Sequence, residues 1–140
     1  MNISIIKAVS VEHLDHVFAI RRKVFVDEQH CPPELEYADE ETSVHFLAFC
    51  NSEPCGAARW RKTNNGYKLE RFAVLKEYRG KEVGATLVKH VLADLPRDGS
   101  KVYLNAQMSA QEFYRKLSFR PVGDQFEEAG IMHQQMVLAP

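Results

Sequence analysis

The order of the elements expected from the sequence predicts one α/β domain over residues 1–140, with a mixed sheet and helices on its faces. Short apolar segments separated by turn residues are typical of strands, and two longer segments repeat apolar residues at helical spacing. Strands precede a strand–helix–strand–helix–strand sequence, which favours a mixed sheet. With 140 residues, 45% of them hydrophobic, the chain is long enough to form a core without disulfides or metals.

The N-terminal part predicts a strand, a helix and a long loop. Residues 4–8 form the strand, and Ser10 is placed to cap a helix that runs to about Phe25. We expect the basic run at residues 20–23 to lie on a solvated helix face. Residues 26–42 then predict a long loop with at most one helical turn, because two prolines interrupt them and acidic residues follow. That acidic stretch either shapes a pocket for a cationic amine, with Glu36 and Asp39 as its test residues, or is a solvated loop.

The remaining elements follow from turn signals and periodicity. In order, we expect strands at residues 44–50, 56–63 and 67–75, a helix at 83–95, a strand at 102–106, a helix after Ser109, and a strand at 131–138. Asn64-Asn65-Gly66 is a strong hairpin signal, because these residues accept positive φ. Ser109 and Glu112 form a capping box for the second of these helices, and Pro121 ends that region.

Charge and cysteine content exclude several classes of protein. The net charge of -1 gives no general attraction for nucleic acid or an anionic membrane, and the sequence contains no apolar run of about 18 residues. Cys31, Cys50 and Cys55 are an odd number, no signal peptide precedes them, and no metal-ligand spacing is present. We therefore expect buried or edge thiols in a cytoplasmic protein, without metal, nucleic-acid or membrane partners.

The segment from the strand at residues 67–75 into the next helix is suited to binding a pyrophosphate. A helix that begins after Lys81 leaves backbone N–H groups free at the positive end of its dipole. Gly80 and Gly84 allow close approach of a ligand, and Arg79 and Lys81 add mobile positive charge. Neither a P-loop nor a Rossmann glycine pattern is present. Taken alone, this segment is equally compatible with a basic loop that caps a surface helix.

Residues 74–84 resemble the acetyl-CoA-binding motif of the GCN5-related N-acetyltransferase (GNAT) family, [Gln/Arg]-x-x-Gly-x-[Gly/Ala]. Arg79 and Gly84 match its ends, whereas Glu82 stands where the family has its first motif glycine. We expect the Glu82 side chain to point to solvent from the first helical turn, because facing the pyrophosphate would repel it. Residues 21–29 also look like a subgroup of small bacterial members, and the resemblance covers most of the chain.

The resemblance implies a GNAT fold: a mostly antiparallel sheet of about six to seven strands, with one splayed strand pair at the acetyl-CoA site. In that fold the backbone of the strand end bonds the pantetheine arm, and the amide of Asn105 contacts it from the next strand or acts as an ordinary turn former. The implied cofactor contacts are Phe72, Ala73, Val74, Arg79, Gly80, Lys81, Glu82, Val83, Gly84, Ala85 and Asn105.

Transfer of an acetyl group to an amine requires a neutral amine, a stabilised oxyanion and a protonated leaving thiolate. By resemblance, Tyr114 is the acid near the coenzyme sulfur, or else a half-buried aromatic, and the N–H of Val74 is the oxyanion donor. Glu70 is the candidate base, because strand alternation places it with Phe72 and Val74 and burial would raise its pKa.

The base has alternatives. Glu70 can instead form an ion pair with Arg59 or Arg61 across the hairpin. Glu28, His45 and His133 are weaker candidates, and a chain of water molecules can replace any of them.

These features predict an acetyl-CoA-dependent N-acetyltransferase that acts by direct transfer in a ternary complex. The acceptor is a primary amine of a small molecule or peptide, and no cysteine lies near the motif as an acyl-enzyme nucleophile. A non-catalytic acyl-CoA sensor is the alternative, and an interaction domain without ligand is a third interpretation. The sequence leaves open whether the chain forms a homodimer.

Overall fold

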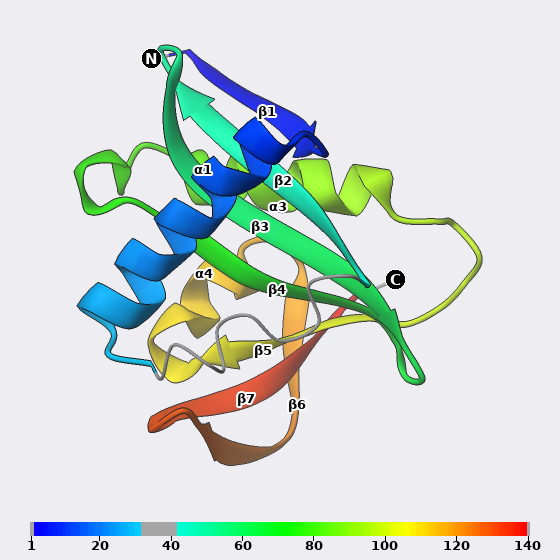
Figure 1. The fold of residues 1–140 in the computed structure, drawn as a ribbon. Helices are drawn as coiled ribbons and strands as arrows, with labels where there is room; N and C mark the ends of the chain where they lie inside the picture. The colour runs from blue at the N-terminus through cyan, green and yellow to red at the C-terminus, as the bar shows by residue number, and fades with distance from the viewer. Residues whose placement is uncertain (1, 32–41, 140) are drawn as a thin grey trace.

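The computed structural model describes residues 2–31 and 42–139 and contains one seven-stranded sheet in the order β1-β2-β3-β4-β5-β7-β6 (Figure 1). The strands are β1 (Ile3–Ala8), β2 (Ser43–Cys50), β3 (Glu53–Thr63), β4 (Gly66–Val74), β5 (Val102–Gln107), β6 (Phe119–Glu128) and β7 (Ile131–Leu138). Every neighbouring pair is antiparallel except β4 and β5, which are parallel. The predicted mixed, mostly antiparallel sheet is confirmed.

Helices cover both faces of this sheet, as predicted. The helical segments are α1 (Val11–Arg21), the π-helix η1 (Arg22–Glu28), η2 (Lys76–Tyr78), α3 (Val83–Asp94), η3 (Met108–Ala110) and α4 (Gln111–Arg115). In Figure 1, α1 crosses in front of the sheet and α3 lies behind it. One core cluster joins α1 and η1 to the sheet around Leu47 and Ala73, and the larger one joins α3 and α4 to the opposite face around Leu87 and Met136.

The N-terminal helix is capped as expected, but its basic end differs from the prediction. The Ser10 hydroxyl oxygen accepts a hydrogen bond from the His13 N–H at 3.1 Å, which satisfies a donor of the first turn. Ile20 and Arg21 are buried, and the Arg21 guanidinium lies 5.5 Å from the centre of the Phe18 ring. The solvated face predicted for residues 20–23 is therefore wrong for Ile20 and Arg21, since an arginine stem packs well against apolar surface.

Two further boundaries differ from the predictions in the C-terminal part. The helix expected to begin at Ser109 begins at Gln111, with Ala110 at its N-cap and without a side-chain capping bond, because a 3₁₀ turn precedes it. The prediction that Pro121 ends the preceding helical region without a strand is also wrong. Pro121 lies within strand β6 and pairs with Met136 of β7. An outer strand tolerates proline, because its missing N–H can lie on the unpaired side. This strand brings the sheet to seven members.

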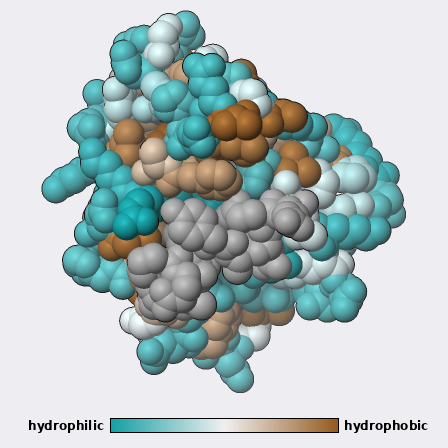
Figure 2. All heavy atoms as spheres, viewed as in Figure 1, coloured by the Kyte–Doolittle hydropathy of each residue, from teal (hydrophilic) through white to brown (hydrophobic). Residues whose placement is uncertain are grey.

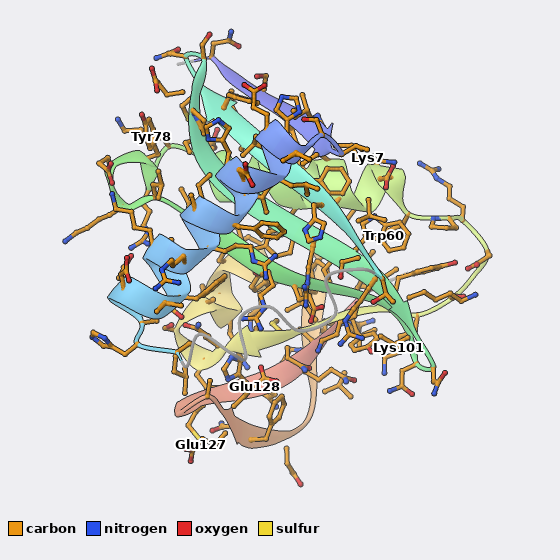
Figure 3. The ribbon with its side chains drawn as sticks, in the orientation of Figure 1. Lys7, Trp60, Tyr78, Lys101, Glu127 and Glu128 are labelled. Carbon is orange, nitrogen blue, oxygen red and sulfur yellow. The ribbon has the colours of Figure 1, made fainter. Side chains whose placement is uncertain are left out.

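Long-range polar contacts fasten the C-terminal end of α3 to the sheet. The Trp60 indole N–H donates to the Asp94 carboxylate at 3.0 Å, and the Lys7 Nζ lies 2.8 Å from the same carboxylate. Lys7 and Trp60 approach this end of α3 from β1 and β3, as Figure 3 shows. α3 is thereby held at its far end, and its N-terminal end lies at the loop that follows β4.

The predicted buried thiols are confirmed. Cys31, Cys50 and Cys55 are buried, and the Cys50 and Cys55 sulfurs lie 3.0 Å apart across the β2–β3 hairpin. Within residues 2–31 and 42–139, no group of three or more His, Cys, Asp or Glu side chains is arranged to bind a metal ion. In the same residues, no helix is both long and apolar enough to cross a bilayer.

Candidate functional site

The two parallel strands at the centre of the sheet separate after a short paired segment. β4 and β5 pair only at Tyr67 with Val102 and at Lys68 with Tyr103, although both strands continue well beyond these positions. Figure 1 shows them diverging toward the side on which α4 lies. The splayed strand pair is confirmed. Within the described part of the chain, the end of β4 from Phe72 to Val74 therefore has a strand partner on one side only.

A β-bulge in β4 changes which face of the sheet its side chains occupy. The register between β3 and β4 shifts here, and Arg71 adopts a left-handed φ of 59°. Leu69 lies in the same core cluster as Phe72 and Val74, so Glu70 points to the opposite face. The prediction that Glu70 shares a face with Phe72 and Val74 is wrong, because the extra residue reverses the alternation.

Glu70 is an ion-pair partner on that opposite face. Its Oε1 accepts hydrogen bonds from Arg59 Nε at 3.0 Å and Arg61 Nε at 2.7 Å, and Lys68 Nζ lies 3.2 Å from Oε2. Burial raises the pKa of this carboxyl, but the charges of Arg59 and Lys68 and the contacts with Arg61 outweigh burial and lower the pKa to about 2. The predicted rise in pKa is wrong, and the ion-pair alternative is confirmed. A carboxylate with this pKa is a weak proton acceptor.

The loop after β4 ends in a left-handed turn that opens α3. Gly80 has a φ of 76° and Glu82, the N-cap residue, a φ of 69°. A glycine adopts this conformation without strain, which gives a physical reason for the family's preference at the position of Glu82. The Glu82 side chain is exposed, in agreement with the expectation that it points to solvent. The N–H groups of Val83, Gly84 and Ala85 open the helix and have no acceptor within it.

Arg79 is held by protein contacts, so the mobile charge predicted for it is wrong. Its Nη1 and Nη2 donate to the two carboxylate oxygens of Glu28 at 2.6 and 2.7 Å, and its Nε donates to the Val74 carbonyl at 2.9 Å. The hydrogen bond from Arg79 lowers the pKa of Glu28, so this weaker base candidate is also a salt-bridge partner. Lys81 is exposed on the same loop, as expected for a mobile cation. Figure 3 shows Tyr78 at the start of this loop.

Tyr114 lies in α4 against the end of β4. It is buried, and its ring makes edge contacts with Phe72, Phe113 and Phe119 at centroid distances of 6.3, 4.9 and 5.9 Å. Burial raises the pKa of its hydroxyl, which keeps the group protonated at neutral pH. Tyr114 therefore contacts Phe72 at the end of β4, the segment for which the resemblance implies coenzyme binding. Its role as an acid stays a prediction.

Close packing joins the strand end, the first turn of α3 and α4. A Cβ added at Gly84 would lie 3.2 Å from the Phe113 ring and 3.9 Å from a Val74 methyl group. Contacts this tight leave little space for a side chain at residue 84. α4 therefore packs against the end of β4 and the first turn of α3, which are close to each other in the sequence.

Asn105 lies on β5, and its side-chain oxygen accepts no hydrogen bond from the described residues. It pairs with Gln135 of β7, and its Oδ1 is buried without a hydrogen-bond partner in the described structure. A buried acceptor of this kind costs about 1–3 kcal/mol unless a ligand supplies a donor. Asn105 lies within β5, in a strand of the splayed pair, so the alternative of an ordinary turn former is wrong, and its contact with the pantetheine arm stays a prediction.

The two histidine candidates lie on different strands: His45 on β2, outside the splayed pair, and His133 on β7, opposite Gln107 at the end of β5. His45 is buried on β2, where its ring contacts Phe18 edge to face. His133 on β7 has its Nδ1 2.7 Å from the Ile131 carbonyl and its Nε2 3.7 Å from Glu128, which Figure 3 labels. The acidic residues at 34, 36 and 39–41 fall outside the described residues, so the structure does not bear on their predicted role.

Motifs and residue spacing did not predict the contact between Gln29 and Gln107. The Gln29 Oε1 at the end of η1 accepts a hydrogen bond from Gln107 Nε2 at the end of β5, at 3.0 Å. These residues are separated by 78 positions, so only the fold brings them together. The resemblance of residues 21–29 to a family segment and the candidate base Glu28 pointed to this region, but neither pointed to this pair.

Figure 2 shows the face of the molecule that carries α1. Hydrophilic residues cover its rim, and hydrophobic residues are visible above the segment drawn in grey. Exposed Val9 and Val11 lie at the start of α1, beside a hollow of about 470 Å³ lined by Leu14, Phe18 and Val44. The hollow lies between α1 and the β1–β2 edge, apart from the splayed strands.

Known proteins share both the sequence pattern and the fold. The family model for the acetyltransferase (GNAT) domain matches residues 7–140. An uncharacterized N-acetyltransferase of Bacillus subtilis, YjcF, is 40% identical over 130 residues, which cover 90% of this chain and 92% of that protein. Escherichia coli ElaA is 34% identical over 131 residues, which cover 89% of this chain and 86% of that protein.

Solved structures agree with this relationship. The crystal structure of ElaA superposes with a TM-score of 0.86 at 30% sequence identity, covering 99% of this chain and 100% of the ElaA chain. An aminoglycoside 6′-N-acetyltransferase complexed with coenzyme A shares the fold, with a TM-score of 0.74 at 17% identity over 100% of this chain and 98% of that one. The match across nearly the whole chain, with the splayed strands and the loop into α3 in place, shows that this chain belongs to the GNAT acetyltransferase family.

Proposed function

We propose that this protein transfers the acetyl group of acetyl-CoA directly to a primary amine of a small-molecule or peptide acceptor. The observation that carries the proposal is the unpaired side of β4 from Phe72 to Val74, which lies between the start of α3 and the buried Tyr114. A backbone edge without a strand partner offers hydrogen bonds to a ligand that carries amide groups.

The residues present fit an acyl-CoA ligand. The backbone of Phe72, Ala73 and Val74 would hold the pantetheine amides, and the unsatisfied Oδ1 of Asn105 would accept a donor from that arm. The first turn of α3 and the exposed Lys81 would hold the pyrophosphate. The aminoglycoside acetyltransferase that shares this fold was solved with coenzyme A, as was a PaiA N-acetyltransferase of Thermoplasma acidophilum.

The chain's own groups suggest how transfer proceeds. As the amine nitrogen bonds to the thioester carbon and the carbon–sulfur bond breaks, the Val74 N–H stabilises negative charge on the carbonyl oxygen. The Tyr114 hydroxyl, kept protonated by burial, donates its proton to the leaving sulfur. Because Glu70 is held by three cations, we assign the proton lost by the amine to water rather than to Glu70.

A second candidate function is an acyl-CoA sensor without turnover. It is favoured by the environment of Glu70: the charges around it lower its pKa, so among the described residues it is not a carboxylate of raised pKa that could serve as the base. Both functions require coenzyme binding, so they differ only in whether an acceptor is acetylated.

Binding and turnover are measured separately to test these functions. Calorimetry with coenzyme A and with pantetheine should give binding for both, about tenfold or more weaker for pantetheine, because it lacks the pyrophosphate. Thiol release from acetyl-CoA is then followed with a panel of amines, polyamines, amino sugars and peptides. Lys81→Gln should weaken coenzyme binding, whereas Lys89→Gln, an exposed lysine further along α3, should not.

Each outcome selects one function. Thiol release that depends on an acceptor supports the transferase. Binding without turnover on any acceptor supports the sensor. Absence of coenzyme binding contradicts both functions.

A further inference from the structure

The π-helix η1 ends in two residues that reach opposite arms of the splayed strands. Glu28 binds Arg79 on the loop that follows β4, through two hydrogen bonds of 2.6 and 2.7 Å. The next residue, Gln29, accepts a hydrogen bond of 3.0 Å from Gln107 at the end of β5. Two consecutive residues therefore connect the two elements that diverge at the proposed acyl-CoA site.

Buried side chains hold η1 against the sheet. Val24 and Phe25 are buried in the core cluster beneath α1, and the Arg71 guanidinium of the β4 bulge lies 5.5 Å from the centre of the Phe25 ring. After Gln29 the chain turns through His30, which has a left-handed φ of 61°. π-helical turns are rare and are concentrated at functional sites.

The Glu28–Arg79 pair fixes geometry more than it contributes energy. Both side chains are about 40% exposed, and exposed ion pairs contribute little to stability. A bidentate contact, however, leaves the planar guanidinium one orientation, and in that orientation Arg79 Nε donates to the Val74 carbonyl at 2.9 Å. The strand end and the loop are thus held together through one side chain.

We propose that Glu28 and Gln29 are positioning residues for the acyl-CoA site, bridging the open end of the splayed strands, and that Arg79 acts as part of this bridge rather than as a phosphate ligand. The inference rests on the proposed coenzyme binding and extends it. Glu28 already neutralises the Arg79 charge, so the pyrophosphate is left to the backbone of α3 and Lys81. Loss of either bridge contact lets the strand end and loop move apart, which raises the KM for acetyl-CoA.

A double-mutant cycle on Glu28 and Arg79 tests the first contact. Glu28→Gln and Arg79→Gln should each raise the Kd for coenzyme A and the KM for acetyl-CoA about threefold to tenfold, and the double variant should be no worse than either single variant. Arg79→Lys should behave like Arg79→Gln, because an ammonium keeps the charge but cannot form the bidentate contact and the bond to Val74 together. Asp27→Asn, which removes an exposed neighbouring carboxylate, is the matched control and should change neither constant.

The opposite pattern would overturn the proposal. If Arg79 binds phosphate directly, Glu28→Gln frees it and tightens coenzyme binding, Arg79→Lys retains affinity, and the two changes combine additively. Melting temperatures separate loss of positioning from loss of folding, since this exposed pair should change them little.

A second cycle with Gln29→Leu and Gln107→Leu examines the other contact. The same non-additive rise in the KM for acetyl-CoA is expected, and additive effects would contradict a bridge. If the unmodified protein binds no coenzyme, the proposed function and the bridge both fail. If it binds coenzyme but either cycle is additive, only the bridge fails.

Discussion

The two halves of β4 belong to one continuous strand but have different surroundings. Around Tyr67 and Lys68 the strand is paired on both sides, whereas from Phe72 to Val74 it pairs with β3 alone. The bulge at Arg71 separates the halves and reverses the faces that their side chains occupy. In the first half the backbone and the Glu70 charge are satisfied within the protein, and in the second half the backbone faces a gap.

This difference shows how one strand can serve stability and binding at once. Changes in the first half should alter the free energy of unfolding, and changes around the second half should alter activity or coenzyme affinity. Loss of turnover without loss of stability in a first-half variant, or normal turnover in a variant of Tyr114, would contradict the assignment of roles.

The largest effect is expected for Tyr114→Phe, beside the second half. Loss of the proton donor should lower kcat about 100-fold or more with little change in the KM for acetyl-CoA. Tyr67→Phe removes a hydroxyl from the first half, where it donates to Asp98 at 2.6 Å, and should leave kcat unchanged. Steady-state thiol release compares the two variants, and equal losses of kcat would break the distinction between the halves.

Glu70→Gln should mainly affect stability. The variant removes a carboxylate that contacts Arg61, Lys68 and the Arg59 side chain, which is 1% exposed, so the free energy of unfolding should fall by about 2–4 kcal/mol. Denaturant titration measures this, with the exposed Glu127→Gln as the matched control. A variant with normal stability but abolished turnover would instead identify Glu70 as the base.

The same carboxylate gives a pH dependence of known sign. The pKa of Glu70 is lowered to about 2 in the folded protein from an ordinary value of 4.5, so its contribution is complete above that ordinary value and is lost as pH falls toward 2. The stability difference between the unmodified protein and Glu70→Gln should therefore narrow through this window. A constant difference from pH 6 to pH 3 would show that the carboxylate is not ion-paired in solution.

Asn105→Leu should stabilise the free protein but weaken its binding of coenzyme A. Replacing the buried unsatisfied amide oxygen with a methyl group of similar shape should stabilise the free protein by about 1 kcal/mol. The same variant should bind coenzyme A about tenfold more weakly, because its acceptor is lost. Thermal unfolding with and without coenzyme A tests both effects, and unchanged affinity would remove Asn105 from the site.

The smallest effect is expected for Glu82→Gly. Because Glu82 has a left-handed φ of 69°, glycine should stabilise the protein by up to about 1 kcal/mol. Lys89→Gly, in the interior of the same helix, should instead destabilise it by about 1 kcal/mol. If Glu82→Gly also tightens coenzyme binding, the Glu82 charge opposes the pyrophosphate even though its side chain is exposed.

Local signals in the sequence were sufficient to predict most helices and strands and to propose where the site lies. Alternating apolar residues, the Asn64-Asn65-Gly66 turn and the helical repeat after Val83 are local signals, because each reflects conformational preference over a few residues. The loop that opens α3 was identified through the resemblance of residues 79–84 to the family's motif. β6 escaped detection because Pro121 disfavours a strand locally, and only pairing with β7 stabilises it there.

Tertiary structure alone decided what the charged residues at the site do. Whether Glu70 faces the site or an arginine cluster depends on one extra residue at the Arg71 bulge, which strand periodicity cannot reveal. Whether Arg79 is mobile or held depends on Glu28, which is 51 residues away in sequence. A charged side chain takes its pKa and its partners from whatever the fold places beside it, so residue type and spacing identified these groups but not their roles.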